Sequence, residues 1–255
     1  MKKISENSIF FGSYSFFLGL AAVIAAVAVV VSSPVLRMTK EQTARLADTE
    51  APLAEKYPKI IIDAGHGGED GGAVAPDGTC EKDINLNVAK YAYEVLSSLG
   101  FDCVLSRDDD VMLSDGEGST KKMRDLKNRV ALTEGGDCVF VSIHQNKFPQ
   151  DTCSGAQVYY SKNDPKSAVL AQTAQDYLRQ YVQPMNTRQI KPAGSEIFVL
   201  DRCAVPAVLI ECGFLSNPAE LVQLKTDEYQ KKLGCVIALS VTDFLSCNSE
   251  AQGIS

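Results

Sequence analysis

The stretch KIIIDAGHGG, residues 59–68, decides the fold of this chain. Its β-branched run is short, continuous and ends at Gly65, which is typical of a strand buried on both faces of a sheet. His66 follows at once, and the glycines around it let main chain approach a bound group closely. The segment therefore predicts a buried strand that ends in a ligand-capable side chain.

Two later segments have the same design, an apolar run followed by polar and small residues. They are SIHQN at 142–146, which contains His144, and IECGF at 210–214, which contains Glu211. In open α/β sheets, ligands bind beyond the carboxyl ends of the strands. We therefore expect His66, His144 and Glu211 to meet in one cleft.

The rest of the chain from residue 59 alternates between strand and helix patterns. This alternation predicts a single α/β domain with a twisted, mostly parallel central sheet of about six strands and helices on both faces. Gly100 and the pair Asn217-Pro218 give the expected end of one helix and start of another. The strands are expected at 59–63, 101–105, 138–143, 156–160, 197–200 and 207–210. The helices are expected at 83–99, 120–134 (with Met123, Leu126 and Val130 inward), 165–182, from 217, and at 227–245, with a loop at 108–119 and a Pro/Gly-containing stretch at 184–195.

The N-terminal segment differs in composition from the remainder. Residues 1–57 hold six basic and five acidic residues, which leaves 19 basic and 27 acidic residues in 58–255. The acidic balance argues against a nucleic-acid binder. No charge occurs from Asn7 to Leu36, which is long enough for a transmembrane helix, and Lys2 and Lys3 precede it. We predict a signal anchor or signal peptide at 1–36, a linker at 37–57, the catalytic domain at 58–248 and a tail at 249–255.

The small-residue triplet at 26–28 lies inside the apolar run rather than after it, which favours an uncleaved anchor. In either case the domain is expected to work outside the cytoplasmic membrane. All eight cysteines lie between Cys80 and Cys247 and form no C-x-x-C pair, so zinc-ribbon and thioredoxin sites are disfavoured. Export permits disulfides. Four cysteines in apolar runs are expected to be small buried residues: Cys103, Cys138, Cys212 and Cys235.

His66 and His144 are the chain's two histidines. Two histidines and one carboxylate, with a fourth position left to water, make a catalytic zinc site. Spacing ranks Glu81 slightly above the other candidates for the third ligand, which are Asp63, Asp70, Asp83, Glu211 and the soft ligand Cys80. For Glu211, the alternative to a catalytic task is a salt bridge to Arg107 or Arg129, since a buried carboxylate needs a partner.

Four segments together resemble the motifs of zinc-dependent N-acetylmuramoyl-L-alanine amidases of the amidase 3 type. They are IDAGHGGEDGGA at 62–73, EKDINL at 81–86, SIHQN at 142–146 and IECGFLSN at 210–217. The resemblance covers residues 59 to about 246 and implies a twisted sheet with helices on both sides. It also implies zinc ligands His66, Glu81 and His144, with Glu211 as the catalytic acid/base. Further features resemble the germination-specific spore-cortex branch: RDDD at 107–110, SGAQVYY at 154–160 and the short N-terminal anchor.

The chain departs from the family pattern at Ala64, at residues 133–136 and at Gln145, where members often carry alanine. These positions concern the rim of the site. The expected substrate-positioning residues are Asn85, Arg107, Asn146 and Gln157, with Arg129 as a further candidate.

The implied reaction is hydrolysis of the amide between N-acetylmuramic acid and L-alanine in peptidoglycan, removing stem peptides during spore-cortex maturation, where muramic lactam forms. The expected partners are peptidoglycan, the membrane through the N-terminal helix, and an activating lipoprotein; no nucleic acid is expected. Two alternatives stay open: a zinc peptidase acting on stem peptides, and a partner-dependent or inactive wall-binding homologue.

Overall fold

A computed structural model describes residue 54 and residues 57–251. The predicted membrane or signal helix and nearly all of the predicted linker lie outside this part of the chain, as do the last four residues. Among the described helices, none combines the length and the apolarity that crossing a membrane requires.

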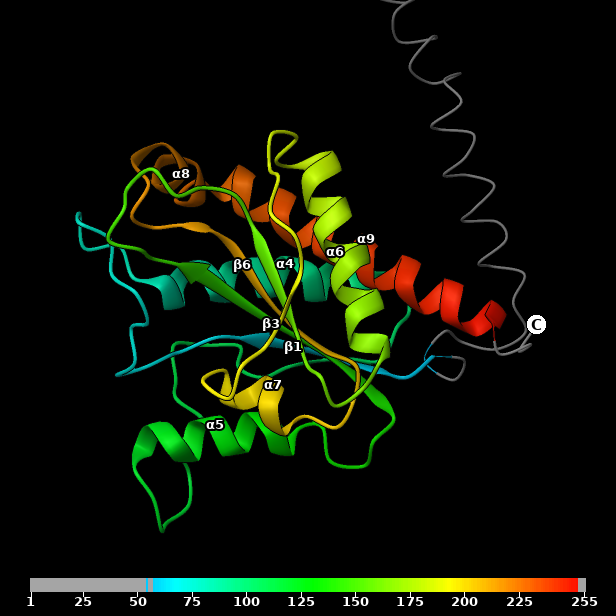
Figure 1. Cartoon of the computed structure of the whole chain (residues 1–255). Helices are drawn as coiled ribbons and strands as arrows, with labels where there is room; N and C mark the ends of the chain where they lie inside the picture. The colour runs from blue at the N-terminus through cyan, green and yellow to red at the C-terminus, as the bar shows by residue number, and fades with distance from the viewer. Residues whose placement is uncertain (1–53, 55–56, 252–255) are drawn as a thin grey trace, which may run out of the picture. The chain divides into compact units, whose positions relative to one another are not determined.

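A six-stranded sheet runs through the domain (Figure 1). Its order is β2-β1-β3-β6-β4-β5, and β2, β1, β3 and β6 are mutually parallel. β4 pairs antiparallel with β6 and parallel with β5, so the sheet is mixed but mostly parallel, as predicted. The strands are β1 Lys59–Ala64, β2 Cys103–Leu105, β3 Cys138–Asn146, β4 Gln157–Tyr160, β5 Lys191–Pro192 and β6 Ala207–Phe214.

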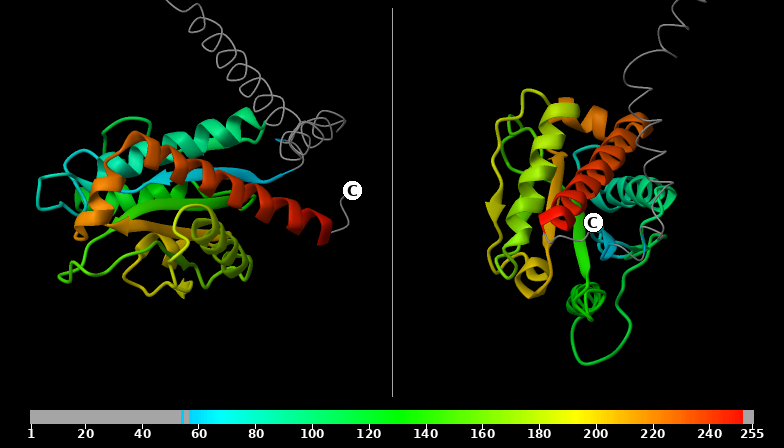
Figure 2. Two further views of the ribbon diagram at one scale, coloured as in Figure 1. Left: turned by 90° about the horizontal axis from the view of Figure 1, so that it is seen from above. Right: turned by 90° about the vertical axis from the view of Figure 1, so that its right-hand side faces the viewer.

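Helices cover both faces of this sheet, and Figure 2 shows the layers from two further sides. One face carries α4 Glu81–Ser98, α6 Lys166–Tyr181 and α9 Asp227–Ala251, and the other carries α5 Lys121–Ala131 and α7 Phe198–Arg202. Alternate residues of β1 enter the two cores: Ile60 and Ile62 join the larger one, and Ile61 joins the smaller one. Burial on both faces explains why this strand is apolar throughout.

Two helix boundaries follow the predicted capping chemistry. Gly100 comes after α4 with a φ of 91°, a left-handed conformation that glycine adopts without a steric penalty. Asn217 caps α8, Pro218–Leu224, where its side-chain oxygen accepts from the N–H groups of Ala219 at 3.0 Å and Glu220 at 3.1 Å. The predicted start of a helix at Asn217-Pro218 is therefore confirmed.

The prediction of a strand at 197–200 is wrong, because this segment starts the short helix α7. Four apolar residues in a row cannot be assigned to helix or strand by periodicity. The position beside β4 is taken instead by Lys191 and Pro192, which pair with Tyr159 and Tyr160. α7 then packs Val199 and Leu200 into the smaller core.

α5 has an unexpected buried face. Leu126 and Val130 pack against the smaller core, as predicted, but the buried side chains of this helix are Asp125 and Arg129. A buried charge needs compensating partners, and both residues have them in the site described below.

None of the eight cysteines is in a disulfide. Cys138 and Cys212 are buried, as expected, whereas Cys103 and Cys235 are only partly buried. Burial raises the pKa of the Cys203 thiol to about 12, which is typical of an inert packing residue.

Candidate active site

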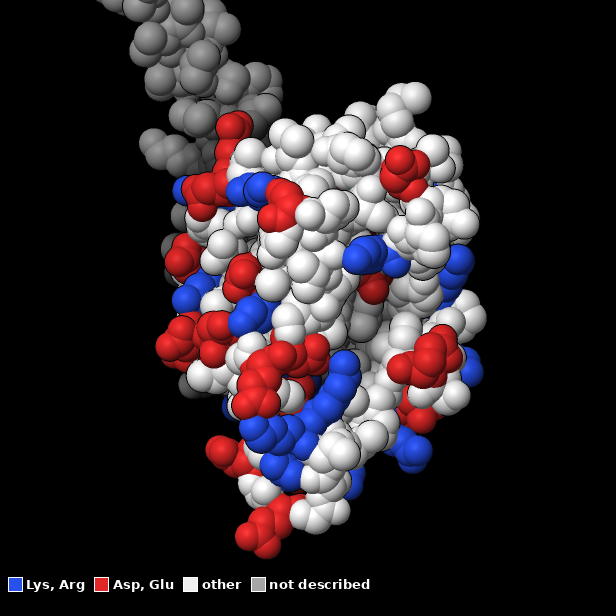
Figure 3. All heavy atoms as spheres, turned by 90° about the vertical axis from the view of Figure 1, so that its left-hand side faces the viewer, with Lys and Arg blue, Asp and Glu red and all other residues white. Residues whose placement is uncertain are grey.

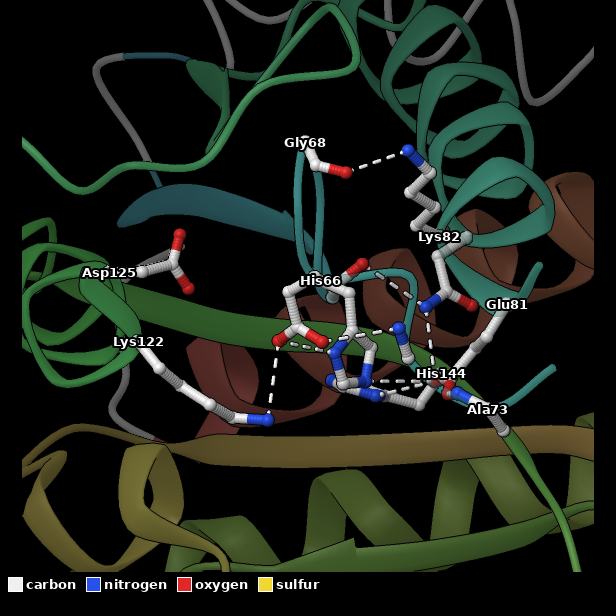
Figure 4. A network of polar contacts seen from close by, with 12 residues as sticks. His66, Gly68, Ala73, Glu81, Lys82, Lys122, Asp125 and His144 are labelled. Carbon is white, nitrogen blue, oxygen red and sulfur yellow. Dashed lines mark hydrogen bonds and ion pairs between the residues drawn. The ribbon is translucent and has the colours of Figure 1, made fainter. Parts of the chain in front are cut away.

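Neighbouring parallel strands bring the three predicted segments to one edge of the sheet. β1 pairs with β3, and β3 pairs with β6 so that His144 lies opposite Glu211. His66 follows β1 by two residues, and Glu81 begins α4. Figure 4 shows the imidazoles of His66 and His144 converging with the side chain of Glu81.

His66, Glu81 and His144 form the group of potential metal ligands found in the described part of the chain, with donor atoms all within 4.8 Å of one another. Glu81 Oε1 lies 2.8 Å from His144 Nδ1 and 3.4 Å from His66 Nε2. The two imidazole rings meet edge to face at 4.9 Å. Two imidazoles and a carboxylate at these separations are able to hold one cation.

Three of the other candidates for a third ligand, Asp63, Asp70 and Cys80, have different partners. Asp63 contacts Arg129 through Oδ1 and accepts from the Ser142 hydroxyl at 2.6 Å through Oδ2. Asp70 Oδ2 lies 2.9 Å from His66 Nδ1 and therefore orients that ring from behind. The Cys80 thiol donates to the carbonyl of Gly78.

Main-chain and amide donors hold the Glu81 carboxylate in place. Oε1 accepts from the N–H of Gln145 at 3.0 Å and from Asn85 Nδ2 at 3.2 Å, and Oε2 accepts from the N–H of Ala73 at 2.8 Å. Burial by itself would raise the pKa of Glu81, but its hydrogen bonds and its attraction to both histidines outweigh burial and lower that pKa. Burial likewise opposes protonation of His66, yet Glu81 and Asp70 raise the pKa of His66 to about 9.

Two glycines leave room for these side chains. A Cβ atom on Gly65 would lie 2.3 Å from His144 Nε2. A Cβ atom on Gly72 would lie 2.6 Å from Glu81 Oε2 and 2.7 Å from His66 Cδ2. Atoms this close would clash, so the loop after β1 needs glycine at both positions.

Glu211 has no ion-pair partner among the described residues. Arg129 pairs with Asp63 and Asp125, and Arg107 donates to main-chain carbonyls, so the alternative salt bridge for Glu211 is not formed. The residue as a whole is half-buried, but its Oε2 is sealed from solvent without a hydrogen-bond partner. Burial first, and then the charge of Glu81, raise the pKa of Glu211 to about 8.

The four predicted substrate-positioning residues lie in different environments. Asn85 and Arg107 are buried beneath the His66 loop, and both donate to the carbonyl of Gly65. Gln157 lies opposite Glu211 in the sheet, is buried and donates to the carbonyl of Gln189. Asn146 is half-buried at the end of β3.

A cavity of about 240 Å³ lies against the two histidines. Its walls include Lys122 and Leu126 of α5, together with Glu196, Ile197 and Phe198 before and at the start of α7. Lys122 reaches Asp70 Oδ2 at 3.3 Å and points toward the histidines (Figure 4). Figure 3 shows this edge of the molecule hollowed, with acidic and basic side chains around the hollow. The sequence pattern of α5 gives Lys122 no distinguishing signal. The predicted strand at 197–200 likewise gives no indication that Ile197 and Phe198 line the site.

Comparison with known proteins agrees with this geometry. Residues 60–243 match the family model of N-acetylmuramoyl-L-alanine amidase. The germination-specific N-acetylmuramoyl-L-alanine amidase of Bacillus subtilis is 36% identical over 191 residues, covering 73% of this chain and 78% of the relative.

Two solved structures are similar as well. The CwlD amidase from Clostridioides difficile, in complex with the GerS lipoprotein, has 39% identity and a TM-score of 0.70, covering 74% of this chain and 99% of that one. An N-acetylmuramoyl-L-alanine amidase from Clostridium difficile 630 has 33% identity and a TM-score of 0.65, covering 74% and 97%. Because the family match spans the sheet, the His66 loop and Glu211, this chain belongs to the N-acetylmuramoyl-L-alanine amidases, enzymes that hydrolyse peptidoglycan.

Proposed function

We propose that this amidase works with a zinc ion held by His66, Glu81 and His144. The observation that carries the proposal is the convergence of the three donor groups within 4.8 Å. Two imidazoles and one carboxylate are the donor set of a catalytic zinc site with an open fourth position, so the residues fit this ion. When bound, zinc supplies a Lewis acid that polarises the scissile carbonyl and makes water a better nucleophile.

Glu211 is proposed as the general acid/base. Its support is positional, since it lies opposite His144 in the sheet and has a carboxylate oxygen with no partner. A buried carboxyl group with a raised pKa exchanges protons readily near neutral pH. A nearby dication would favour the carboxylate and lower this pKa from its value of about 8.

In the proposed reaction, Glu211 carries one proton from water to the leaving amine. Glu211 takes a proton from water as the water oxygen bonds to the carbonyl carbon of the lactyl group of N-acetylmuramic acid. The bond from that carbon to the nitrogen of L-alanine then breaks, and Glu211 passes the proton to the leaving amine. The products are a lactyl carboxylic acid, which then loses its proton to solvent at neutral pH, and a stem peptide with a free amino terminus.

For substrate positioning, the exposed part of the site differs from its buried support. The side chains of Asn85 and Arg107 already donate hydrogen bonds to the main chain beneath the His66 loop. Among the four predicted residues, we therefore place Asn146 nearest the substrate, with Gln157 behind it. The cavity beside α5 and α7 is proposed to take the peptide, because Lys122 and Glu196 suit its charged groups.

The decisive experiment compares the wild-type protein with Glu211→Gln on spore-type peptidoglycan in the presence of zinc. Mass spectrometry of the digest should show new peptides that begin with L-alanine for the wild type. Glu211→Gln should keep its zinc and lose nearly all turnover, because an amide cannot carry the proton. Near-normal cleavage by this variant would contradict the assignment of Glu211 as the general acid/base.

The metal assignment has its own measurement. Glu81→Ala should lower the zinc content of the purified protein, since one of three ligands is removed. Asp83→Ala, on the same turn of α4, is a matched control and should keep it. Unchanged zinc stoichiometry in Glu81→Ala would assign the third ligand to another residue.

The same digest tests the alternatives. A zinc peptidase would release amino termini from within the stem peptide and leave L-alanine attached to the sugar. An inactive wall-binding homologue would bind peptidoglycan without releasing peptides. A partner-dependent enzyme would release peptides only after its activator is added.

We further propose a spore-cortex role outside the cytoplasmic membrane, with the apolar run of residues 16–31 as an anchor and an activating lipoprotein as a partner. Support comes from the germination-specific relative and from the CwlD amidase, whose solved structure is a complex with the GerS lipoprotein. Deletion of the gene should reduce muramic lactam in spore peptidoglycan. An unchanged lactam content would favour a role in vegetative cells.

A further inference from the structure

Three consecutive main-chain carbonyl groups, from the last residue of β1 to His66, accept hydrogen bonds from two buried guanidinium groups. Arg129 donates to the carbonyl of Ala64 at 2.8 Å and to that of His66 at 2.7 Å. Arg107 donates to the carbonyl of Ala64 at 3.0 Å and to that of Gly65 at 3.1 Å. We call this arrangement, Arg107 and Arg129 on the carbonyls of residues 64–66, the arginine clamp.

The clamp acts at a strained point of the backbone. His66 has a φ of 61°, and it is the non-glycine residue with a positive φ in the described part of the chain. Side chains disfavour this conformation, and it persists only where surrounding contacts enforce it. The carbonyls of Gly65 and His66 belong to the two peptide planes that flank the His66 Cα atom. Fixing both planes therefore fixes the direction in which the imidazole leaves the main chain.

The charges of the clamp are balanced. Arg129 is paired with Asp63 and with Asp125, whose Oδ2 lies 2.8 Å from Arg129 Nε. Arg107 donates four hydrogen bonds, all to main-chain carbonyls, including those of Lys82 and Asp109. The two guanidinium groups and the two carboxylates sum to zero, so the clamp can hold the loop without adding net positive charge beside a cation site.

We propose that Arg107 and Arg129 are positioning residues that act on the metal through His66. They contribute no ligand atom; they hold the His66 backbone in the conformation that directs its imidazole toward Glu81 and His144. This inference rests on the proposed zinc site. Partners that orient metal ligands typically change metal affinity about 10–100-fold when they are removed.

Arg107→Met is the informative variant, because it fills the same space without leaving an unpaired carboxylate. In the full-length protein, we expect zinc binding, measured by competition with a chromogenic chelator, to weaken about 10–100-fold. The visible spectrum of the cobalt-substituted protein should change as well, since it reports ligand geometry rather than stability. Arg107→Lys keeps the charge but cannot span several carbonyls, and should give an intermediate affinity.

Arg124→Met is the matched control. The Arg124 guanidinium also donates to main-chain carbonyls, those of Ser114 and Ser119, but it touches none of residues 64–66. This variant should lower the melting temperature of the metal-free protein while leaving zinc affinity and the cobalt spectrum unchanged. It therefore separates loss of stability from loss of positioning.

The outcomes are distinct. Wild-type zinc affinity and cobalt spectrum in Arg107→Met, with only a lower melting temperature, would overturn the clamp and leave the zinc site intact. If Arg107→Met does not fold, Arg107→Lys decides by the same two readouts. If the wild type does not bind zinc, or if Glu81→Ala binds it equally well, the proposed zinc site fails first and the inference fails with it.

Discussion

The glycine at position 65 shows how closely the main chain and the side chains of the proposed metal site are packed. The loop after β1 passes so near His144 that a single added carbon at Gly65 would lie 2.3 Å from the imidazole. Gly71, in the same loop, differs, because a Cβ atom there would meet Cys80 Sγ at 3.6 Å, an ordinary contact distance.

We predict that Gly65→Ala abolishes zinc binding, because the new methyl group must displace either the loop or the ring of His144. Gly71→Ala, the control, should bind zinc like the wild type. Isothermal titration with zinc measures both. Equal affinities in the two variants would show that the loop relaxes without cost and would contradict the tight packing inferred here.

At the scale of secondary structure, a helix cap and side-chain hydrogen bonds support the loops of the site. Asn217 caps α8 and also donates to the carbonyl of Cys153 at 3.2 Å, and Glu220 of the same helix accepts from the N–H groups of Gly155 and Phe214. One short helix therefore ties the end of β6, three residues beyond Glu211, to the loop before β4.

We predict that Asn217→Ala lowers the free energy of unfolding by about 1 kcal/mol, the usual cost of losing a cap. Asn217→Asp keeps the capping oxygen and should lose less. Urea denaturation followed by circular dichroism measures both. Equal losses in the two variants would mean that the bond to Cys153, which both lack, matters more than the cap.

In α5, the hydrophobic pattern predicts the apolar residues that face the core but not the buried charged residues. Its apolar residues Leu126 and Val130 were predicted to face inward and do so, but Asp125 and Arg129 are more deeply buried. Hydrophobic periodicity cannot identify a buried ion pair of this kind, because one of the two carboxylates that compensate Arg129, that of Asp63, is on a strand more than sixty residues earlier.

For the whole molecule, the pair of Asp63 and Arg129 joins β1 to α5. Burial opposes the charge of Asp63, but the Arg129 guanidinium and the hydroxyls of Ser142 and Ser106 outweigh it and hold the pKa of Asp63 below its ordinary value of 3.8. A carboxyl group whose pKa is lowered by folding stabilises the folded state above its ordinary pKa. This stabilisation is lost as the pH falls below that value.

We predict that Asp63→Asn lowers the free energy of unfolding at pH 7 by about 3–5 kcal/mol, the usual cost of breaking a buried ion pair. The difference from the wild type should shrink below about pH 4, where the wild-type carboxyl group begins to lose its advantage. Denaturation curves at pH 7 and pH 3 measure this. Asp77→Asn removes an exposed pair with Lys225 and should change little at either pH. A difference for Asp63→Asn that does not depend on pH would contradict the role of its charge.

The amino-acid sequence by itself determined the strands that precede His66, His144 and Glu211, because a continuous apolar run that ends in polar and small residues has few other interpretations. It also determined the start of α8 and the end of α4, since Asn-Pro and glycine are local signals. Three features were decided only by the tertiary structure. They are the identity of the carboxylate that joins the two histidines, the position of Arg107 and Asn85 beneath the loop, and the helical conformation of residues 198–202. Each depends on which distant segments the sheet order brings together, and spacing along the chain does not contain that information.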